Sequence, residues 1–104
     1  MMKRQYRQGD VLLHPIAALP STAKRVTVER RIVLAEGEVT GHAHAIEATP
    51  DVELYELEGT LYLRVLETVP LKHEEHAEIA VSPGTYEVKR QVEEWMDEVR
   101  RVAD

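Results

Sequence analysis

Residues 52–67 form two β-like runs separated by a Glu58-Gly59 pair, and the second run has a period of two. In this second run, aliphatic residues occupy every other position from Leu61 to Val65. Successive side chains of a β-strand point to opposite faces, so this period is typical of a strand with one buried face. A glycine-containing break between two such runs is typical of a tight turn. The sequence therefore predicts a β-hairpin with strands at 52–57 and 60–67.

Other short β-like runs are separated by Gly and Pro at intervals typical of a small sandwich or barrel. The Pro-Gly pair at 83–84 is a strong turn signal, and it favours a second pair of strands, one on each side of the turn. The strands beyond the first hairpin are expected at 11–14, where Pro15 ends the run, at 26–28, 31–34 and 44–48, and at 77–81 and 85–90 around the turn.

The tail of the chain follows a different pattern. Its apolar residues recur with helical spacing, which predicts a short amphipathic helix over 92–101, with a strand as the alternative. A chain of 104 residues is long enough for one hydrophobic core, and no linker suggests a second domain. We therefore expect a single, mostly β domain over 1–104, a barrel or a sandwich, with a short C-terminal helix.

Composition narrows the classes of function. The formal net charge of −6 argues against broad binding to nucleic acid or to an anionic membrane surface. The chain has no cysteine, so any bound metal must be held by nitrogen and oxygen atoms. No stretch has the length of a transmembrane helix, and the polar start lacks an apolar signal region, so a cytoplasmic location is expected.

Four of the five histidines fall in two short segments, His42 and His44 in Gly-His-Ala-His and His73 and His76 in His-Glu-Glu-His. Neutral imidazole is the commonest metal ligand in proteins, and pairs of histidines from two segments can build one site. His42 and His44 share a face if they lie in a strand. His73 and His76 would converge only in a turn or a single helical turn. The sequence therefore predicts a metal site made by these four residues.

Three or four imidazoles with an oxygen ligand or water suit Zn²⁺, Fe²⁺, Mn²⁺, Ni²⁺ or Cu²⁺. Glu74 and Glu75 lie beside the expected ligands, so either could act as a general base if the metal activates water. The competing interpretation is that the histidines are polar residues near turns that bind no metal and respond to pH. His14 stands apart from both segments and is expected to make a hydrogen bond at a strand end.

Part of this pattern resembles the cupins, small β-barrels that hold a metal with His-x-His, a Glu and a later His. The matching residues are His42-Ala43-His44, Glu47 and the Pro83-Gly84 turn. The chain departs from the cupin pattern because no histidine follows that turn, so a histidine of segment 73–76 would have to replace the last ligand. The resemblance implies a metal-holding barrel and permits oxygenase, isomerase or hydrolase chemistry.

More of the chain resembles a group of uncharacterised small bacterial and phage proteins. Their motifs are a Gly-Asp-Val-Leu start, Gly-His-x-His, His-x-x-His and Pro-Gly-x-Tyr-x-Val-x-Arg-Gln, which fall here at 9–12, 41–44, 73–76 and 83–91. This resemblance supports the choice of site residues and implies no particular reaction.

Two functions from different classes follow from these observations. The first is a metal-binding small β protein, which as an enzyme would act on a small molecule at an open coordination position. The second is a non-enzymatic structural or interaction module, with a structural metal or none, that forms homo-oligomers through its strand edges. The sequence leaves open whether the protein is an enzyme.

Overall fold

The computed structural model of the chain describes residues 4–36 and 41–90. This part of the chain forms β-strands and contains no helix. The strands are β1 (Tyr6–Gln8), β2 (Val11–Ile16), β3 (Lys24–Val26), β4 (Arg31–Glu36), β5 (Ala43–Glu47), β6 (Val52–Leu57), β7 (Thr60–Val65), β8 (Val69–Leu71), β9 (Ile79–Val81) and β10 (Gly84–Arg90). The helix expected over 92–101 lies outside the described residues.

The hairpin predicted from the period of two is confirmed. β6 and β7 pair antiparallel over their whole length, with Leu57 opposite Thr60. The two residues between them have positive φ, 50° at Glu58 and 84° at Gly59. A two-residue turn of this kind matches the twist of the strands that it joins, which explains why the glycine stands there.

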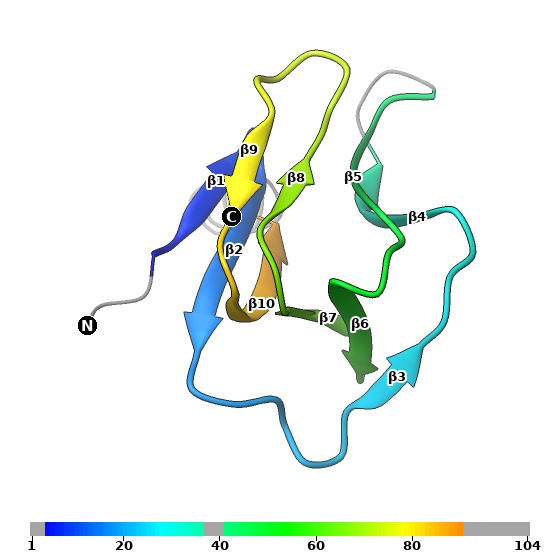
Figure 1. Cartoon of the computed structure of the whole chain (residues 1–104), viewed down its shortest axis with the longest axis vertical. Coiled ribbons are helices and arrows are strands. Elements are labelled where there is room, and N and C mark those ends of the chain that lie inside the picture. Colours follow the sequence, from blue (N-terminus) through cyan, green and yellow to red (C-terminus); the bar gives the residue numbers. More distant parts are fainter. Residues whose placement is uncertain (1–3, 37–40, 91–104) are drawn as a thin grey trace, which may run out of the picture.

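This hairpin belongs to a six-stranded antiparallel sheet with the order β1-β2-β10-β7-β6-β3 (Figure 1). β10 is a central strand, because it pairs with β2 on one side and with β7 on the other. Its register with β2 places Arg90 opposite Val11. The end of β10 therefore lies beside the Gly9-Asp10 turn that leads into β2.

The other four strands form two antiparallel pairs, β4 with β5 and β8 with β9. The pairs are joined by reciprocal backbone hydrogen bonds of 2.9 Å between Ala45 and Lys72. The strands thus follow one another in the order β4-β5-β8-β9, and in Figure 1 β8 and β9 pass in front of the main sheet.

One hydrophobic core lies between the main sheet and these pairs. It contains aliphatic side chains that the alternation of each strand directs inward, and burying each such side chain contributes about 1.5–3 kcal/mol. The main sheet supplies Val11, Leu13, Val52, Leu54, Leu63 and Val65, and the two pairs supply Ile32, Leu34, Ala35, Ile46, Val69, Leu71 and Val81.

Two buried tyrosines of the main sheet hold the segment that follows β9. The Tyr6 hydroxyl accepts a hydrogen bond from the Ser82 amide at 3.1 Å and donates to Ser82 Oγ at 2.9 Å. The Tyr86 hydroxyl donates to the Ser82 carbonyl at 2.7 Å, and the two rings meet edge to face with centroids 5.9 Å apart. These bonds fix Ser82 in the connection that leads from β9 to β10 of the main sheet.

Several details of the expected strands are wrong. The strand expected at 26–28 lies earlier, at Lys24–Val26, and β1 and β8 were not expected. Pro15 does not end its strand, because β2 continues to Ile16. β1 pairs only with residues 11–13 of β2, so no strand is paired with Pro15 on the β1 side. Proline, which has no N–H, is tolerated at such a position.

The runs on either side of Ser82-Pro83-Gly84 are both strands, but they do not form a hairpin, because β9 pairs with β8 while β10 pairs with β2 and β7.

The mostly β fold class is confirmed, whereas the described strands do not close into a barrel. β1 and β3 end the main sheet, so it has two open edges. A cupin-like barrel is accordingly not confirmed.

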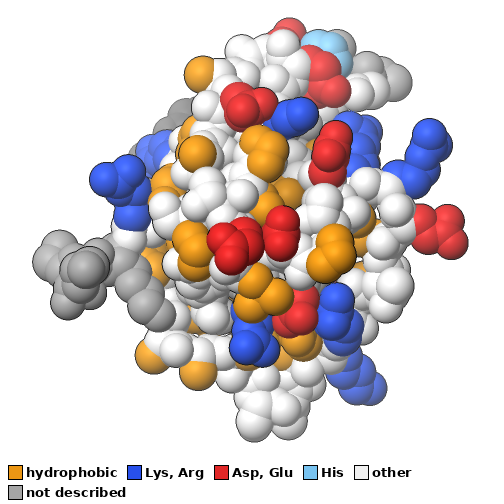
Figure 2. Space-filling model, in the orientation of Figure 1, with side chains coloured by type: hydrophobic (Ala, Val, Ile, Leu, Met, Phe, Trp, Pro, Cys, Tyr) orange, Lys and Arg blue, Asp and Glu red, His pale blue; other side chains and the backbone are white. Residues whose placement is uncertain are grey.

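The surface of the described residues is mixed in character. Figure 2 shows hydrophobic, acidic and basic side chains interspersed on one face. Leu66, at 43% exposed, is the one large hydrophobic side chain that is exposed among the described residues. Residues 4–36 and 41–90 include no helix with the length and hydropathy needed to cross a membrane.

Candidate metal centre

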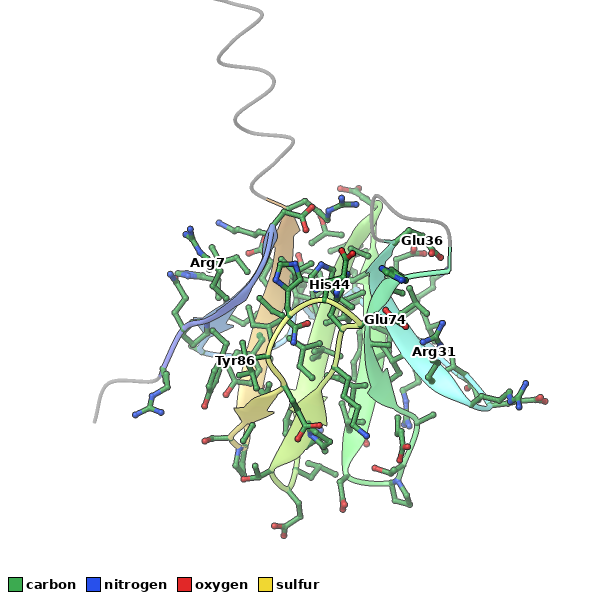
Figure 3. All side chains as sticks on the ribbon, turned by 90° about the horizontal axis from the view of Figure 1, so that it is seen from above. Arg7, Arg31, Glu36, His44, Glu74 and Tyr86 are labelled. Atoms are coloured by element: carbon green, nitrogen blue, oxygen red, sulfur yellow. The ribbon has the colours of Figure 1, made fainter. Side chains whose placement is uncertain are left out.

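The loop between β8 and β9 carries the second histidine segment and is fixed against β5. The Ala45–Lys72 hydrogen bonds hold the start of the loop. Two residues further on, Glu74 Oε1 accepts a hydrogen bond of 2.9 Å from the Ala43 amide at the start of β5. Figure 3 shows His44 and Glu74 close together where this loop crosses the end of the sheet. The two histidine segments therefore meet although about 30 residues separate them.

Three histidines come together at this place, and we call His44, His73 and His76 the three-histidine site. Each offers one ring nitrogen, and these atoms all lie within 4.8 Å of one another. The ring centroids are 4.3 Å apart for His44 and His73, 4.6 Å for His73 and His76, and 5.7 Å for His44 and His76. The turn in segment 73–76 thus makes its two histidines converge. This group could hold a metal ion.

The three imidazoles differ in exposure. His44 is 1% exposed and lies in β5, on the same face as Ile46 of the hydrophobic core. His73 is half-buried and His76 is exposed. The site therefore has one fixed, buried imidazole and two imidazoles on a surface loop, which would leave a metal ion a path from solvent.

Gln8 determines which nitrogen of His44 carries the proton. The Gln8 amide nitrogen donates to two backbone carbonyls, those of Leu71 at 2.9 Å and Ala77 at 3.0 Å. Its oxygen therefore faces His44 Nδ1, 2.9 Å away. Because an amide oxygen can only accept, Nδ1 of His44 must donate, and in the neutral ring the lone pair is on Nε2. A backbone-anchored partner of this kind is how proteins orient ligand histidines.

Asp10 and Arg90 lie on the other side of His44. Arg90 donates to Asp10 Oδ2 from Nε at 3.0 Å and from a terminal nitrogen at 2.7 Å. The second oxygen of this carboxylate, Oδ1, is 3.2 Å from His44 Nε2. The lone pair of His44 therefore points toward a carboxylate oxygen.

The charge states of these groups follow from their surroundings. Burial lowers the pKa of His44, and the charges of His73 and His76 lower it further, against the opposing effect of Asp10. Partial burial raises the pKa of Asp10, but the hydrogen bonds and charge of Arg90 outweigh it, so the net pKa is below the ordinary value. At neutral pH the site thus combines a neutral buried imidazole with an ionised carboxylate.

His73 has a different hydrogen bond. Its Nδ1 accepts from the Glu75 amide at 3.0 Å, at the surface of the loop. A metal ion that takes this lone pair would replace the Glu75 hydrogen bond. The exchange costs about 1 kcal/mol, the net value of one such bond, which is small beside the binding energy of a metal.

Gly9 gives the three-histidine site its space. Its φ is +58°, and a Cβ at this position would lie 2.8 Å from His76 Nε2 and 3.2 Å from His44 Cε1. Only glycine provides both the left-handed conformation and the close approach without strain. The backbone of the Gly9-Asp10 turn therefore forms one wall of the site.

Of the other histidines, His42 lies at the edge of the site and His14 lies apart from it. His42 precedes β5 instead of sharing a strand face with His44, and its ring is 5.9 Å from that of His73. Its Nδ1 is buried without a hydrogen-bond partner, 3.7 Å from Glu75 Oε2. His14 lies in β2, where its Nδ1 is 3.1 Å from Gln5 Oε1.

Glu74 is held by the backbone. The hydrogen bond from the Ala43 amide lowers its pKa, and the neighbouring histidines contribute to the same effect. A lower pKa makes this carboxylate a weaker base at neutral pH.

A cleft adjoins the site on the outer face of β5. Its volume is about 330 Å³, and it contains polar groups of both charges around two alanines. The lining residues are Arg31, Ala43, Ala45, Glu47, Lys72, His73 and Glu74. A small molecule in this cleft would contact the three-histidine site through His73.

Three residues beside His44 were not among the sequence candidates: Gln8, Asp10 and Arg90. Asp10 and Arg90 do fall in motifs that carried the resemblance, the start at 9–12 and the run at 83–91. Their occurrence in these motifs was the one signal in the sequence that pointed to them. Their contact joins residues 80 positions apart, which no local spacing indicates.

Comparison with protein families places the chain in one of them. Residues 7–91 match the family described as "Domain of unknown function (DUF8820)", and the chain belongs to that family. The matched segment includes every residue of the site described above. The comparisons with curated proteins and with solved structures gave no significant match.

Proposed function

We propose that the protein binds one divalent transition-metal ion at the three-histidine site. The observation that carries this proposal is the mutual distance of at most 4.8 Å between ligand nitrogens from two separate segments. Ligands at about 2.0–2.1 Å from a tetrahedral ion are about 3.3 Å apart, so small rotations of the two loop histidines would complete the coordination. The neutral state of buried His44 supports the proposal because only an unprotonated imidazole binds metal.

His42 belongs to the proposal as an additional ligand. Its unpartnered Nδ1 and its position beside His73 support this role. His42→Ala distinguishes a four-histidine site from a three-histidine site, because it should lower the affinity for the metal only if His42 is a ligand.

Isothermal titration with Zn²⁺ tests the proposed function. Wild type should bind about one equivalent, and His44→Ala should lose at least 100-fold in affinity because the one buried ligand is gone. His14→Ala is the matched control, since it removes an imidazole that hydrogen-bonds Gln5 and should bind like wild type. Equal affinity of wild type and His44→Ala would contradict a metal at this place.

We further propose that the protein is an enzyme that uses this metal ion. The cleft beside His73 supports it, because a small-molecule substrate there would reach an open coordination position. Glu74 and Glu75 are the two carboxylates proposed as general base, and the Ala43 hydrogen bond lowers the pKa and the basicity of Glu74. The cupin resemblance permits oxygenase, isomerase or hydrolase chemistry and ranks none of them.

The alternative proposal is a non-enzymatic module in which the metal stabilises the β8–β9 loop against β5. The open edges of the main sheet support homo-oligomer formation through added strand pairing. Sedimentation of the metal-loaded and metal-free protein distinguishes a monomer from such an assembly. The cytoplasmic location and the single domain over 1–104 stay predictions from the sequence.

A further inference from the structure

We propose that Oδ1 of Asp10 is an oxygen ligand of the metal ion at the three-histidine site. The inference rests on the proposed function, since it adds a fourth donor to that site. With the three histidines it makes a donor set of three imidazoles and one carboxylate, to which His42 would add a further imidazole.

The donor and acceptor atoms around His44 favour this assignment. Gln8 cannot rotate its amide without losing two hydrogen bonds to backbone carbonyls, so its oxygen faces His44 Nδ1. Nδ1 therefore donates, and Nε2 of the neutral ring presents a lone pair. Asp10 Oδ1 lies 3.2 Å from that nitrogen and is also an acceptor. Two acceptors at this distance repel each other unless a proton or a metal ion lies between them.

The distance between Nε2 of His44 and Oδ1 of Asp10 also favours a shared ion. Two ligand atoms at about 2.0–2.1 Å from one tetrahedral ion are about 3.3 Å apart. The observed separation of 3.2 Å between Nε2 of His44 and Oδ1 of Asp10 matches that value. This pair is already spaced for a shared ion, whereas the loop histidines have to move closer.

Arg90 holds the carboxylate of Asp10 in a fixed orientation. Its guanidinium donates two hydrogen bonds to the same carboxylate oxygen, Oδ2, and leaves Oδ1 directed at His44. This arrangement fixes the carboxylate for one-oxygen ligation and favours its ionised form. Carboxylate ligands that are hydrogen-bonded on their second oxygen are a recurrent feature of metal sites.

The donor set determines which metal ions the site favours. A carboxylate neutralises one of the two charges of a divalent ion, and a set of imidazole and carboxylate donors suits divalent ions better than Cu⁺, which prefers sulfur. Four protein ligands would close a tetrahedral Zn²⁺ site, whereas a six-coordinate ion would keep two positions for water or substrate.

A Co²⁺ titration followed by visible absorption tests the inference in the full chain. Asp10→Asn should weaken Co²⁺ binding by about 100-fold or more and shift the absorption bands, because a neutral amide replaces an anionic ligand. Asp51→Asn is the matched control: Asp51 is exposed at a turn, and its substitution should leave affinity and spectrum unchanged. Wild-type affinity and an unchanged spectrum in Asp10→Asn would overturn the inference while leaving the three-histidine site intact.

An NMR measurement on the wild type tests the same inference without requiring that Asp10→Asn folds. The chain contains four aspartates, so carboxyl-¹³C labelling of aspartate gives a simple NMR spectrum. Addition of Zn²⁺ should shift the Asp10 carboxyl resonance and leave that of Asp51 in place. Zn²⁺ binding without a shift at Asp10 would overturn the ligand role alone, and absence of Zn²⁺ binding would overturn the proposed function together with it.

Discussion

The oxygen of Gln8 accepts a hydrogen bond from Nδ1 of buried His44 at 2.9 Å, and this contact decides which face of the imidazole is available to a ligand. The glutamine is itself 2% exposed and fixed by two backbone carbonyls. A site with one such orienting partner is arranged before the ion arrives. The energetic benefit is that fewer groups have to be ordered on binding.

Replacement of Gln8 by leucine should weaken both folding and metal binding. The Leu71 and Ala77 carbonyls and His44 Nδ1 would lose their partner, which costs about 1–3 kcal/mol for each group that stays buried. Zn²⁺ affinity should fall about 10–100-fold, because His44 is no longer held in the required tautomer. Titration calorimetry and urea denaturation measure the two effects.

Gln5→Leu is the control for this substitution, since Gln5 is exposed and its side chain contacts His14 instead of the site. It should change neither property appreciably. A Gln8→Leu variant with wild-type Zn²⁺ affinity would show that the orienting contact is unimportant.

Substitution of Gly9 by alanine should damage the site as well as the backbone. The left-handed conformation at φ +58° costs a non-glycine residue about 1–2 kcal/mol. The added methyl would also lie 2.8 Å from His76 Nε2, so the ring must move. Both the free energy of unfolding and the Zn²⁺ affinity should decrease.

Gly59→Ala separates these two causes. Gly59 also has positive φ, but a Cβ there would meet nothing within 4 Å. This variant should lose stability without a change in metal affinity. If both alanine variants bound Zn²⁺ equally well, the proposed contact between Gly9 and the histidines would be wrong.

Metal should stabilise the fold because it binds the native arrangement of segments that are separate in the unfolded chain. At a free ion concentration of 100 times Kd the stabilisation is about 2.7 kcal/mol, or about 10 to 20 °C in Tm for a domain of this size. Chelation by EDTA should reverse the shift. Calorimetric scans of the wild type with and without Zn²⁺ measure it, and His44→Ala should show no shift.

Tyr86 should ionise only at strongly alkaline pH. Burial raises its pKa to about 12, and the neighbouring Tyr6 acts in the same direction. Since the folded pKa is above the unfolded value, the neutral phenol stabilises the fold below pH 10, and this contribution is lost as the pH rises toward 12. Absorbance at the tyrosinate band during a pH titration, compared between wild type and Tyr86→Phe, checks this. A Tyr86 signal that titrates near pH 10 would contradict it.

The elements that could be predicted from the sequence are those with local causes. The β6–β7 hairpin follows from alternation and a Glu58-Gly59 turn, and its register is set by the turn itself. The pairing around Ser82 could not be predicted in the same way, because Ser82 is held by Tyr6 and Tyr86. The bonds to Tyr6 span 76 residues, and β9 pairs with β8 instead of β10.

The same distinction holds for the site. The two histidine segments stand out in the sequence because their residue types are rare and clustered. Their meeting depends on the hydrogen bonds of Ala45 with Lys72, which belong to the tertiary fold. Gln8 and Asp10 were missed since their roles come from contacts with His44 across the sheet layers.

Elemental analysis of untagged protein, with wild type beside His44→Ala, tests the metal site most directly. We expect close to one equivalent of a divalent transition metal in the wild type and its loss in the variant. Wild-type protein that contains no metal, and whose Tm does not change with added Zn²⁺, Fe²⁺, Mn²⁺, Ni²⁺ or Cu²⁺, would contradict this expectation.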